Sequence, residues 1–154
     1  MSETTGTIEA PSYQKQVQFT NPPEAVFEAL TTAAGVAGWW VPTTGSGVEG
    51  GELRLTFPPG PGVMRVDTAQ PSSTVVWTVL ACDFLPDWVG TQIIFVLHPS
   101  KGGGTTLEFR HQGLTPQLEC YEQCQQGWDY YLPSLRDYVE TSAGRPGPRP
   151  RAAS

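Results

Sequence analysis

The segment Pro116–Glu140, PQLECYEQCQQGWDYYLPSLRDYVE, is the longest stretch of the chain with a regular hydrophobic period. Its large apolar residues recur at steps of three and four, which is the spacing of one face of an α-helix. They are Leu118, Tyr121, Cys124, Trp128, Tyr131, Leu132, Leu135, Tyr138 and Val139. Thr115 suits the N-cap and Pro116 the first helical position, so we predict one helix about 37 Å long. A helix with so wide an aromatic face needs a broad surface to cover it.

Two residues interrupt the favourable pattern inside this predicted helix. Gly127 weakens a helix by about 1 kcal/mol relative to Ala, and Pro133 removes a backbone hydrogen bond at a cost of about 3 kcal/mol. A bend that lets the helix follow a curved sheet would explain both residues, and so would a hinge that opens one half of the helix over a cavity. The residues alone leave these two interpretations open.

The rest of the chain predicts strands separated by turns. Tyr13–Thr20 alternates with period two and predicts a first strand. Asn21 suits the N-cap of a short helical region, which Gly35 and Gly38 break up. Five later segments have strand patterns: Glu52–Phe57, Val63–Thr68, Thr74–Asp83, Thr91–His98 and Thr105–His111. This order predicts an α+β fold, with a curved antiparallel sheet of about six strands wrapped around the long C-terminal helix.

Length and composition favour one domain. The 154 residues carry a net charge of −6, which argues against a nucleic-acid partner. No run of about 20 apolar residues is present, which argues against a membrane partner. We predict a single domain over residues 12–142, between a disordered start at 1–11 and a disordered Pro- and Arg-rich tail at 143–154. Because no apolar signal peptide opens the chain and the cysteine count of 3 is odd, we expect a cytoplasmic location.

No catalytic or metal-binding motif stands out in the sequence. The histidines and cysteines are His98, His111, Cys82, Cys120 and Cys124. Cys120 and Cys124 lie one helical turn apart, so a metal pair is conceivable, but no CxxC or HxxxH spacing exists and we expect neither a metal nor a cofactor. Nucleophile-elbow, HExxH and phosphate-loop signatures are missing as well. An enzyme of cyclase or hydrolase type, with His111 or Asp83 as its base, is a weaker alternative to a protein that binds without catalysis.

Aromatic residues are plentiful for a chain of this size, with 5 Trp, 5 Tyr and 6 Phe. For any single ring, ordinary core packing is the simplest interpretation. As a set, the rings also suit a cavity for a flat, largely apolar ligand, since such cavities combine aromatic walls with a few polar groups. The candidate ligand-binding residues are Trp39, Trp40, Phe57, Trp77, Phe95, Phe109, His111, Gly113, Leu114, Trp128 and Tyr131.

Four motifs resemble one known superfamily. They are NPPEAVFEALT at Asn21–Thr31, GWWVP at Gly38–Pro42, GGGTTLEFRHQGL at Gly102–Leu114 and GWDYYLPSLRDYVE at Gly127–Glu140. With the order of elements, they make the chain similar to the helix-grip fold of the START or SRPBCC superfamily, which Bet v-like proteins share. Within it, the chain resembles the branch named after the C-terminal domain of the heat-shock chaperone ATPase activator. The resemblance implies a cavity under the last helix, and it favours the bend over the hinge because that branch often has a proline at the position of Pro133.

The chain is also similar to the self-sacrifice resistance proteins of enediyne producers. This resemblance implies that the protein binds an activated, calicheamicin-like enediyne, loses a hydrogen atom from a glycine to the drug's diradical, and is cleaved there, so that DNA is spared. Gly113, between the last strand and the long helix, is the glycine to which the resemblance points. A tight turn would also need a glycine there, and the two interpretations are compatible.

We therefore expect a monomer whose partner is a small natural product. Two other functions are alternatives under the same resemblance. One is a START-like protein for another hydrophobic ligand, and the other is a module that acts on the chaperone ATPase.

Overall fold

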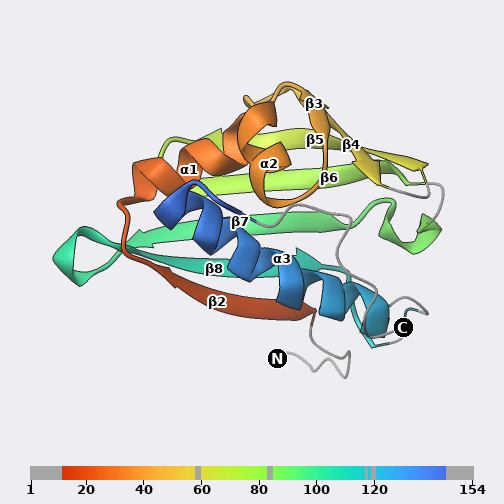
Figure 1. The fold of residues 1–154 in the computed structure, drawn as a ribbon. Helices are drawn as coiled ribbons and strands as arrows, with labels where there is room; N and C mark the ends of the chain where they lie inside the picture. The colour runs from red at the N-terminus through yellow and green to blue at the C-terminus, as the bar shows by residue number, and fades with distance from the viewer. Residues whose placement is uncertain (1–11, 58–59, 83–84, 117, 119–120, 145–154) are drawn as a thin grey trace, which may run out of the picture.

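The computed structural model describes residues 12–57, 60–82, 85–116, 118 and 121–144 (Figure 1). In chain order the elements are β2 (Tyr13–Phe19), α1 (Pro23–Thr31), α2 (Ala33–Trp39), β3 (Thr43–Gly45), β4 (Glu52–Phe57), β5 (Gly60–Gln70), β6 (Thr74–Cys82), η1 (Pro86–Trp88), β7 (Gln92–Pro99), η2 (Lys101–Gly103), β8 (Thr105–Gln112) and α3 (Tyr121–Thr141). The strands form one 7-stranded antiparallel sheet in the order β2-β8-β7-β6-β5-β4-β3. The predicted α+β, helix-grip architecture is confirmed.

One face of the sheet is apolar and covered by helices. Buried and more exposed side chains alternate along β7, which buries Ile93, Phe95 and Leu97 and leaves the residues between them partly exposed. The antiparallel register of β2 and β8 sets Val17 opposite Leu107 and brings the first strand beside the last. An apolar face needs a cover, and α3, α1 and α2 lie across it, as Figure 1 shows.

The sheet has 7 strands where about six were expected. The additional strand is β3, whose 3 residues are too few for an alternating pattern to be recognised. β5 is longer than predicted and covers 11 residues. Its first residues, Gly60, Pro61 and Gly62, were missed because they are residue types that favour turns. Two register shifts against β6 break the alternation within the predicted part of the strand.

α3 runs from Tyr121 to Thr141 and continues without interruption through Gly127 and Pro133. Its buried face follows the predicted period. Ser134 is an addition to that face, because its hydroxyl donates a hydrogen bond of 2.9 Å to the Trp39 carbonyl and docks α2 on α3.

The predicted start of this helix at Pro116, with Thr115 as its cap, is wrong. The amide of Tyr13 donates to the Leu114 carbonyl at 2.9 Å, so the chain is held beside β2 after β8 has ended. It then leaves in a turn, in which the amide of Leu118 donates to the Thr115 carbonyl at 3.0 Å. The helix therefore has 21 residues and a length of about 32 Å.

The helical region after the first strand is two helices. The hydroxyl of Thr32 accepts a bond of 2.9 Å from the amide of Gly35 and so begins α2. Gly35, which was expected to break the helix, instead lets α2 approach α1, since a Cβ there would lie 2.9 Å from the Ala29 Cα. The N-cap of α1 is Pro22 and not Asn21.

The predicted disordered ends fall mostly outside the described residues, which begin at 12 and end at 144. The boundaries of the domain at 12 and 142 stay predictions. In the part of the chain that the structure describes, no helix combines the length and the apolar character needed to cross a membrane.

Candidate ligand-binding site

A pocket of about 110 Å³ lies between α3, the end of α2, the end of β4 and the loop around η1. Among the described residues, its walls are Trp40, Phe57, Leu85, Trp88, Gln123, Cys124, Gly127, Trp128 and Tyr131. Five of these nine side chains are aromatic. Pockets for drug-sized ligands measure roughly 300–1,000 Å³. The pocket therefore has room for one small ring, and a larger ligand can enter only if a wall moves.

Trp40 and Trp128 form the centre of the aromatic walls. Their ring centroids are 4.9 Å apart. Trp40 also contacts Phe57 at 5.6 Å and Tyr131 at 6.5 Å. Trp128 is stacked on Trp88 at 6.1 Å, with the two planes 6° apart. Aromatic pairs at such separations attract by about 0.5–1.5 kcal/mol beyond the burial of their area, so ring packing holds the walls together.

The structure brings four of the predicted residues to the pocket, namely Trp40, Phe57, Trp128 and Tyr131. Six others are buried in the core: Trp39, Trp77, Phe95, Phe109, His111 and Leu114. Gly113 is exposed in the turn after β8, has a φ of 100°, and is not among the pocket walls. Periodicity predicts which side chains are buried, but it does not say which of them border a hollow.

Five wall residues are missing from the prediction: Leu85, Trp88, Gln123, Cys124 and Gly127. Leu85 and Trp88 come from the loop around η1, where no period places a side chain. Cys124 belongs to the predicted buried face of the helix, so the sequence contained a signal for it. Gly127 also had a sequence signal, because a glycine inside a helix is unfavourable and is therefore often explained by packing or function.

The explanation for Gly127 is space. A Cβ built at Gly127 meets no atom of the described residues within 4 Å. The glycine therefore leaves the wall contributed by α3 open at this point, although it weakens the helix by about 1 kcal/mol. Its place in the pocket wall accounts for Gly127 without a hinge.

His111 is fully buried and links α3 to the loop around η1. Its Nδ1 accepts a hydrogen bond of 3.0 Å from Trp128 Nε1, which assigns the ring proton to Nε2. Nε2 then donates to the Thr91 hydroxyl at 2.8 Å, and that hydroxyl donates to the Trp88 carbonyl at 2.6 Å. Because Trp88 and Trp128 are pocket walls, His111 helps to fix the positions of both through hydrogen bonds, although it is not itself a wall.

This environment does not suit a general base. Burial lowers the pKa of His111 from 6.5 to about 3, so its imidazole is neutral near pH 7. Both ring nitrogens are in hydrogen bonds inside the protein. Asp83, the other residue considered as a base, lies outside the described residues. Within the described ranges, no three His, Cys, Asp or Glu side chains cluster in a way that would hold a metal ion.

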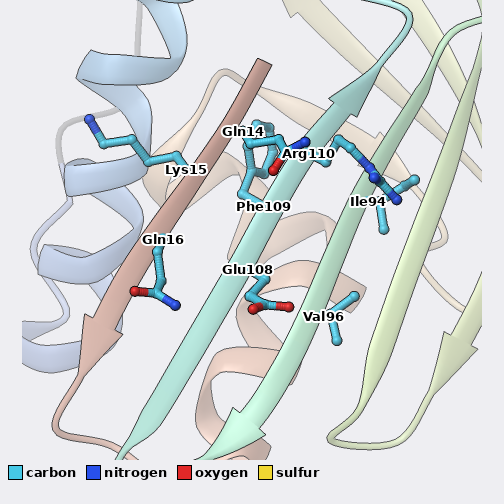
Figure 2. A pocket seen from close by; sticks show the side chains of 8 residues that line it. All are labelled: Gln14, Lys15, Gln16, Ile94, Val96, Glu108, Phe109 and Arg110. Carbon is cyan, nitrogen blue, oxygen red and sulfur yellow. The ribbon is translucent and has the colours of Figure 1, made fainter. Parts of the chain in front are cut away.

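A larger hollow of about 420 Å³ lies over β2, β8 and β7 on the outer face of the sheet (Figure 2). It is lined by Gln14, Lys15, Gln16, Ile94, Val96, Glu108, Phe109 and Arg110. Phe109 is the aromatic residue of the set, and its ring packs on the inner side of the sheet at 4.6 Å from Trp128. The outer hollow is thus bordered mainly by polar and charged side chains, and the inner pocket is the better candidate for an apolar ligand.

An antiparallel sheet whose inner face is covered by one long C-terminal helix defines the helix-grip class of ligand-binding folds. Sequence comparison gives the family within this class. The chain belongs to the family of Activator of Hsp90 ATPase homolog 1-like proteins, whose model matches residues 20–140. This match confirms the predicted branch of the superfamily. Comparison with curated proteins finds no match.

Several solved structures are similar. The Aha1 dimer from Colwellia psychrerythraea is 28% identical with a TM-score of 0.76, over 86% of this chain and 98% of that one. CalU16 from Micromonospora echinospora is 20% identical with a TM-score of 0.70, over 94% and 74% of the two chains. DynU16, from the dynemicin biosynthetic locus, is 24% identical with a TM-score of 0.66, over 85% and 48%. At the last two identities the likeness shows a shared fold.

The neutral state of His111 predicts a pH-dependent stability. Between pH 6.5 and about 3, the unfolded chain binds a proton at this ring and the folded chain does not. The free energy of unfolding should therefore fall as the pH is lowered through this window, by up to about 1.4 kcal/mol per pH unit. Urea titrations between pH 7 and pH 4 measure the slope, and His111→Gln, which cannot titrate in this window, should make it shallower.

The matched control is His98→Gln at the exposed end of β7, which removes a histidine and its surface contact of 3.2 Å with Glu108 without touching the buried network. It should change the slope less than His111→Gln does, since exposed pairs contribute little to stability. An equal slope in the parent protein and in His111→Gln would contradict the assignment of a neutral, buried imidazole.

Proposed function

We propose that this protein binds a flat, largely apolar natural product of the enediyne class in the pocket under α3. One observation carries the proposal: five aromatic walls border a helix position, Gly127, that is left open. Aromatic walls with few polar groups suit a flat conjugated ligand. The resemblance to resistance proteins of enediyne producers selects the ligand class. A fold shared with a protein of the dynemicin biosynthetic locus agrees with that choice.

We further propose that the bound drug and the protein destroy each other. One radical centre of the drug's diradical takes a hydrogen atom from a glycine Cα, and the other takes one from the activating thiol. The glycyl radical is delocalised over the two flanking amides and adds dioxygen. Thiol reduces the resulting peroxyl group to a hydroxyl group, with formation of disulfide and water, and the α-hydroxyglycine breaks at its N–Cα bond into a C-terminal amide and a glyoxylyl fragment. Gly113 suits the role because it is exposed and lies two residues after His111, whose ring contacts the pocket wall Trp88 at 4.7 Å. We place the reactive end of the ligand on this side of the pocket.

The open position in α3 provides a test of the binding site. Gly127→Ala should raise the free energy of unfolding by up to about 1 kcal/mol, since Ala is the better helix former. Gly127→Leu should fill the pocket and weaken the binding of calicheamicin, without thiol, by about tenfold or more. Tryptophan quenching gives the dissociation constants, and urea titration gives the stabilities.

Gln126→Leu is the matched control, because it adds the same side chain to an exposed position of the same helix. It should leave the dissociation constant unchanged. A folded Gly127→Leu protein that binds as tightly as the parent would place the ligand elsewhere.

The sacrificial step is tested by labelling. Protein in which every glycine Cα carries deuterium, incubated with calicheamicin and thiol, should transfer deuterium to the aromatised drug and yield two fragments that join at Gly113. Gly113→Ala should resist this cleavage, because the methyl group shields the Cα. With a φ of 100° and a new Cβ 2.8 Å from Thr91 Cγ2, the substitution should also cost about 1 kcal/mol of stability or more.

Gly90→Ala controls for that strain, since Gly90 has a φ of 90° and open space around it. It should be cleaved like the parent protein. Unchanged cleavage between residues 112 and 114 in a folded Gly113→Ala protein would remove Gly113 from the proposed role, and an aromatised drug without deuterium would exclude a glycine as the donor.

A second candidate function is stimulation of a chaperone ATPase. The family match and the likeness to an Aha1 protein favour it. The outer surface does not, because among the described residues the exposed large apolar side chains are Val48 and Val89, and protein partners usually bury a larger apolar patch. We expect no change in the turnover of an Hsp90-type chaperone when the protein is added in an ATPase assay, and a clear stimulation would favour this second function.

The oligomeric state and the cellular setting are part of the same proposal. We propose that the acting unit is a monomer, since one chain supplies every wall of the pocket described above, although the Colwellia relative was solved as a dimer. A cytoplasmic location, independence from cofactors and a lack of catalytic turnover belong to the same proposal.

A further inference from the structure

Trp77 carries a buried hydrogen-bond donor without a partner. Its side chain is fully buried, and its Nε1–H finds no acceptor among the residues that the structure describes. Three other indole groups are bonded: Trp39 to the Ala29 carbonyl, Trp88 to Cys124 Sγ and Trp128 to His111 Nδ1. Because native proteins pair almost every buried donor, an orphan N–H requires an explanation.

The position of Trp77 suggests one. Trp77 lies in the middle of β6, and its indole is stacked on that of Trp40, with centroids 6.1 Å apart and planes 13° apart. Trp40 is itself a wall of the pocket, whereas Trp77 is not among the walls. The indole that carries the orphan donor therefore lies one ring behind the pocket surface.

Trp40 and Trp88 are the tryptophan walls that neither a strand nor the long helix α3 holds. Trp40, which caps the C-terminus of the 7-residue helix α2, is the one of the two whose ring is stacked on Trp77. Phe57 and Trp77, by contrast, are held in the ladders of β4 and β6. The ring of Trp40 contacts six others: Trp39, Phe57, Trp77, Trp88, Trp128 and Tyr131. A flat ligand offers the same kind of ring-to-ring contact and can replace these partners.

We infer that the Trp40 ring is displaced when the ligand enters, and that the Trp77 Nε1–H then donates a hydrogen bond to an acceptor oxygen on the ligand. This inference rests on the proposed binding of a flat apolar compound under α3 and adds a specificity to it. The ligand class becomes a flat, unsaturated ring system with a carbonyl or similar oxygen attached. Displacement of Trp40 also supplies the volume that a pocket of about 110 Å³ lacks.

The experiment compares two probes of nearly equal shape, 2-acetylnaphthalene, which has a carbonyl oxygen, and 2-isopropenylnaphthalene, which has a CH₂ group in its place. The ratio of their affinities should favour the ketone about three- to tenfold more in the parent protein than in Trp77→Phe, which lacks the donor. In ¹H–¹⁵N spectra, the indole N–H of Trp77 should move downfield with the ketone and not with the alkene.

Trp39→Phe is the matched control, because Trp39 is also fully buried beside Trp40 and Phe95 but its N–H is already bonded. It should keep the affinity ratio of the parent protein.

Trp40→Leu tests the displacement of the Trp40 ring. Because its side chain is smaller, the variant should bind both probes more tightly than the parent protein. Weaker binding of both probes would show that the Trp40 ring is a fixed wall and would overturn its displacement.

The outcomes separate this inference from the proposed function. If both probes bind but their affinity ratio is the same in the parent protein and in Trp77→Phe, the pocket stands and the role of Trp77 is overturned. If neither probe binds, the inference is overturned, and the calicheamicin titration of the parent protein and Gly127→Leu decides the proposed function separately.

Discussion

Trp128 is the contact on which the rest of the structure depends. Its ring packs on Phe109 of β8 at 4.6 Å and on Trp40 at the end of α2 at 4.9 Å. Its N–H donates a hydrogen bond to His111, which is bonded in turn to Thr91 beside η1. One side chain of α3 therefore connects the helix to β8, to the end of α2 and to the loop around η1. Removing a buried tryptophan ring typically costs about 3–5 kcal/mol, against a total stability of about 5–15 kcal/mol. The same ring is also a pocket wall. Fold and binding site are thus built from one cluster of rings, so a substitution at Trp128 changes stability and ligand binding together. Substitutions at Gly127 and Trp77 can change binding while the fold is kept.

The pocket is small because the same rings form the core and the pocket walls. Five aromatic walls fill most of the space under α3, which stabilises the free protein, and what remains is about 110 Å³. A drug-sized ligand must then exchange ring contacts with the protein, and such an exchange is possible because a flat unsaturated ligand offers the same stacked and edge-to-face contacts as the rings that it replaces. The hydrogen-bonded frame of Trp128, His111 and Thr91 is the part that we expect to stay in place, since its buried donors would otherwise lose their partners.

Much of the fold could be predicted from the sequence. The period of α3 identified Trp128, Tyr131 and Leu135 as buried, and the alternation in β4 gave that strand its observed ends. The start of α3 was predicted too early because Thr115, Pro116 and Leu118 match a cap, a first helical position and the helical period, whereas hydrogen bonds to β2 and within a turn hold the chain there instead. The pocket was predicted only in part, because burial is a property of a local pattern, whereas a hollow arises where several elements fail to fill a space. Trp88 shows the difference, since it reaches the pocket from a loop and through contacts that are distant in the sequence.

The central claim, that one molecule of this protein binds and consumes one molecule of an enediyne, is tested most directly by a titration. Calicheamicin, thiol and plasmid DNA are held constant while the protein is added, and the intact plasmid and the cleaved protein are measured together. The account predicts that DNA protection becomes complete at one protein per drug, with one protein cleaved for each drug inactivated. Protection at a small fraction of one protein per drug would indicate catalysis, and unprotected DNA beside intact protein in excess would contradict the account altogether.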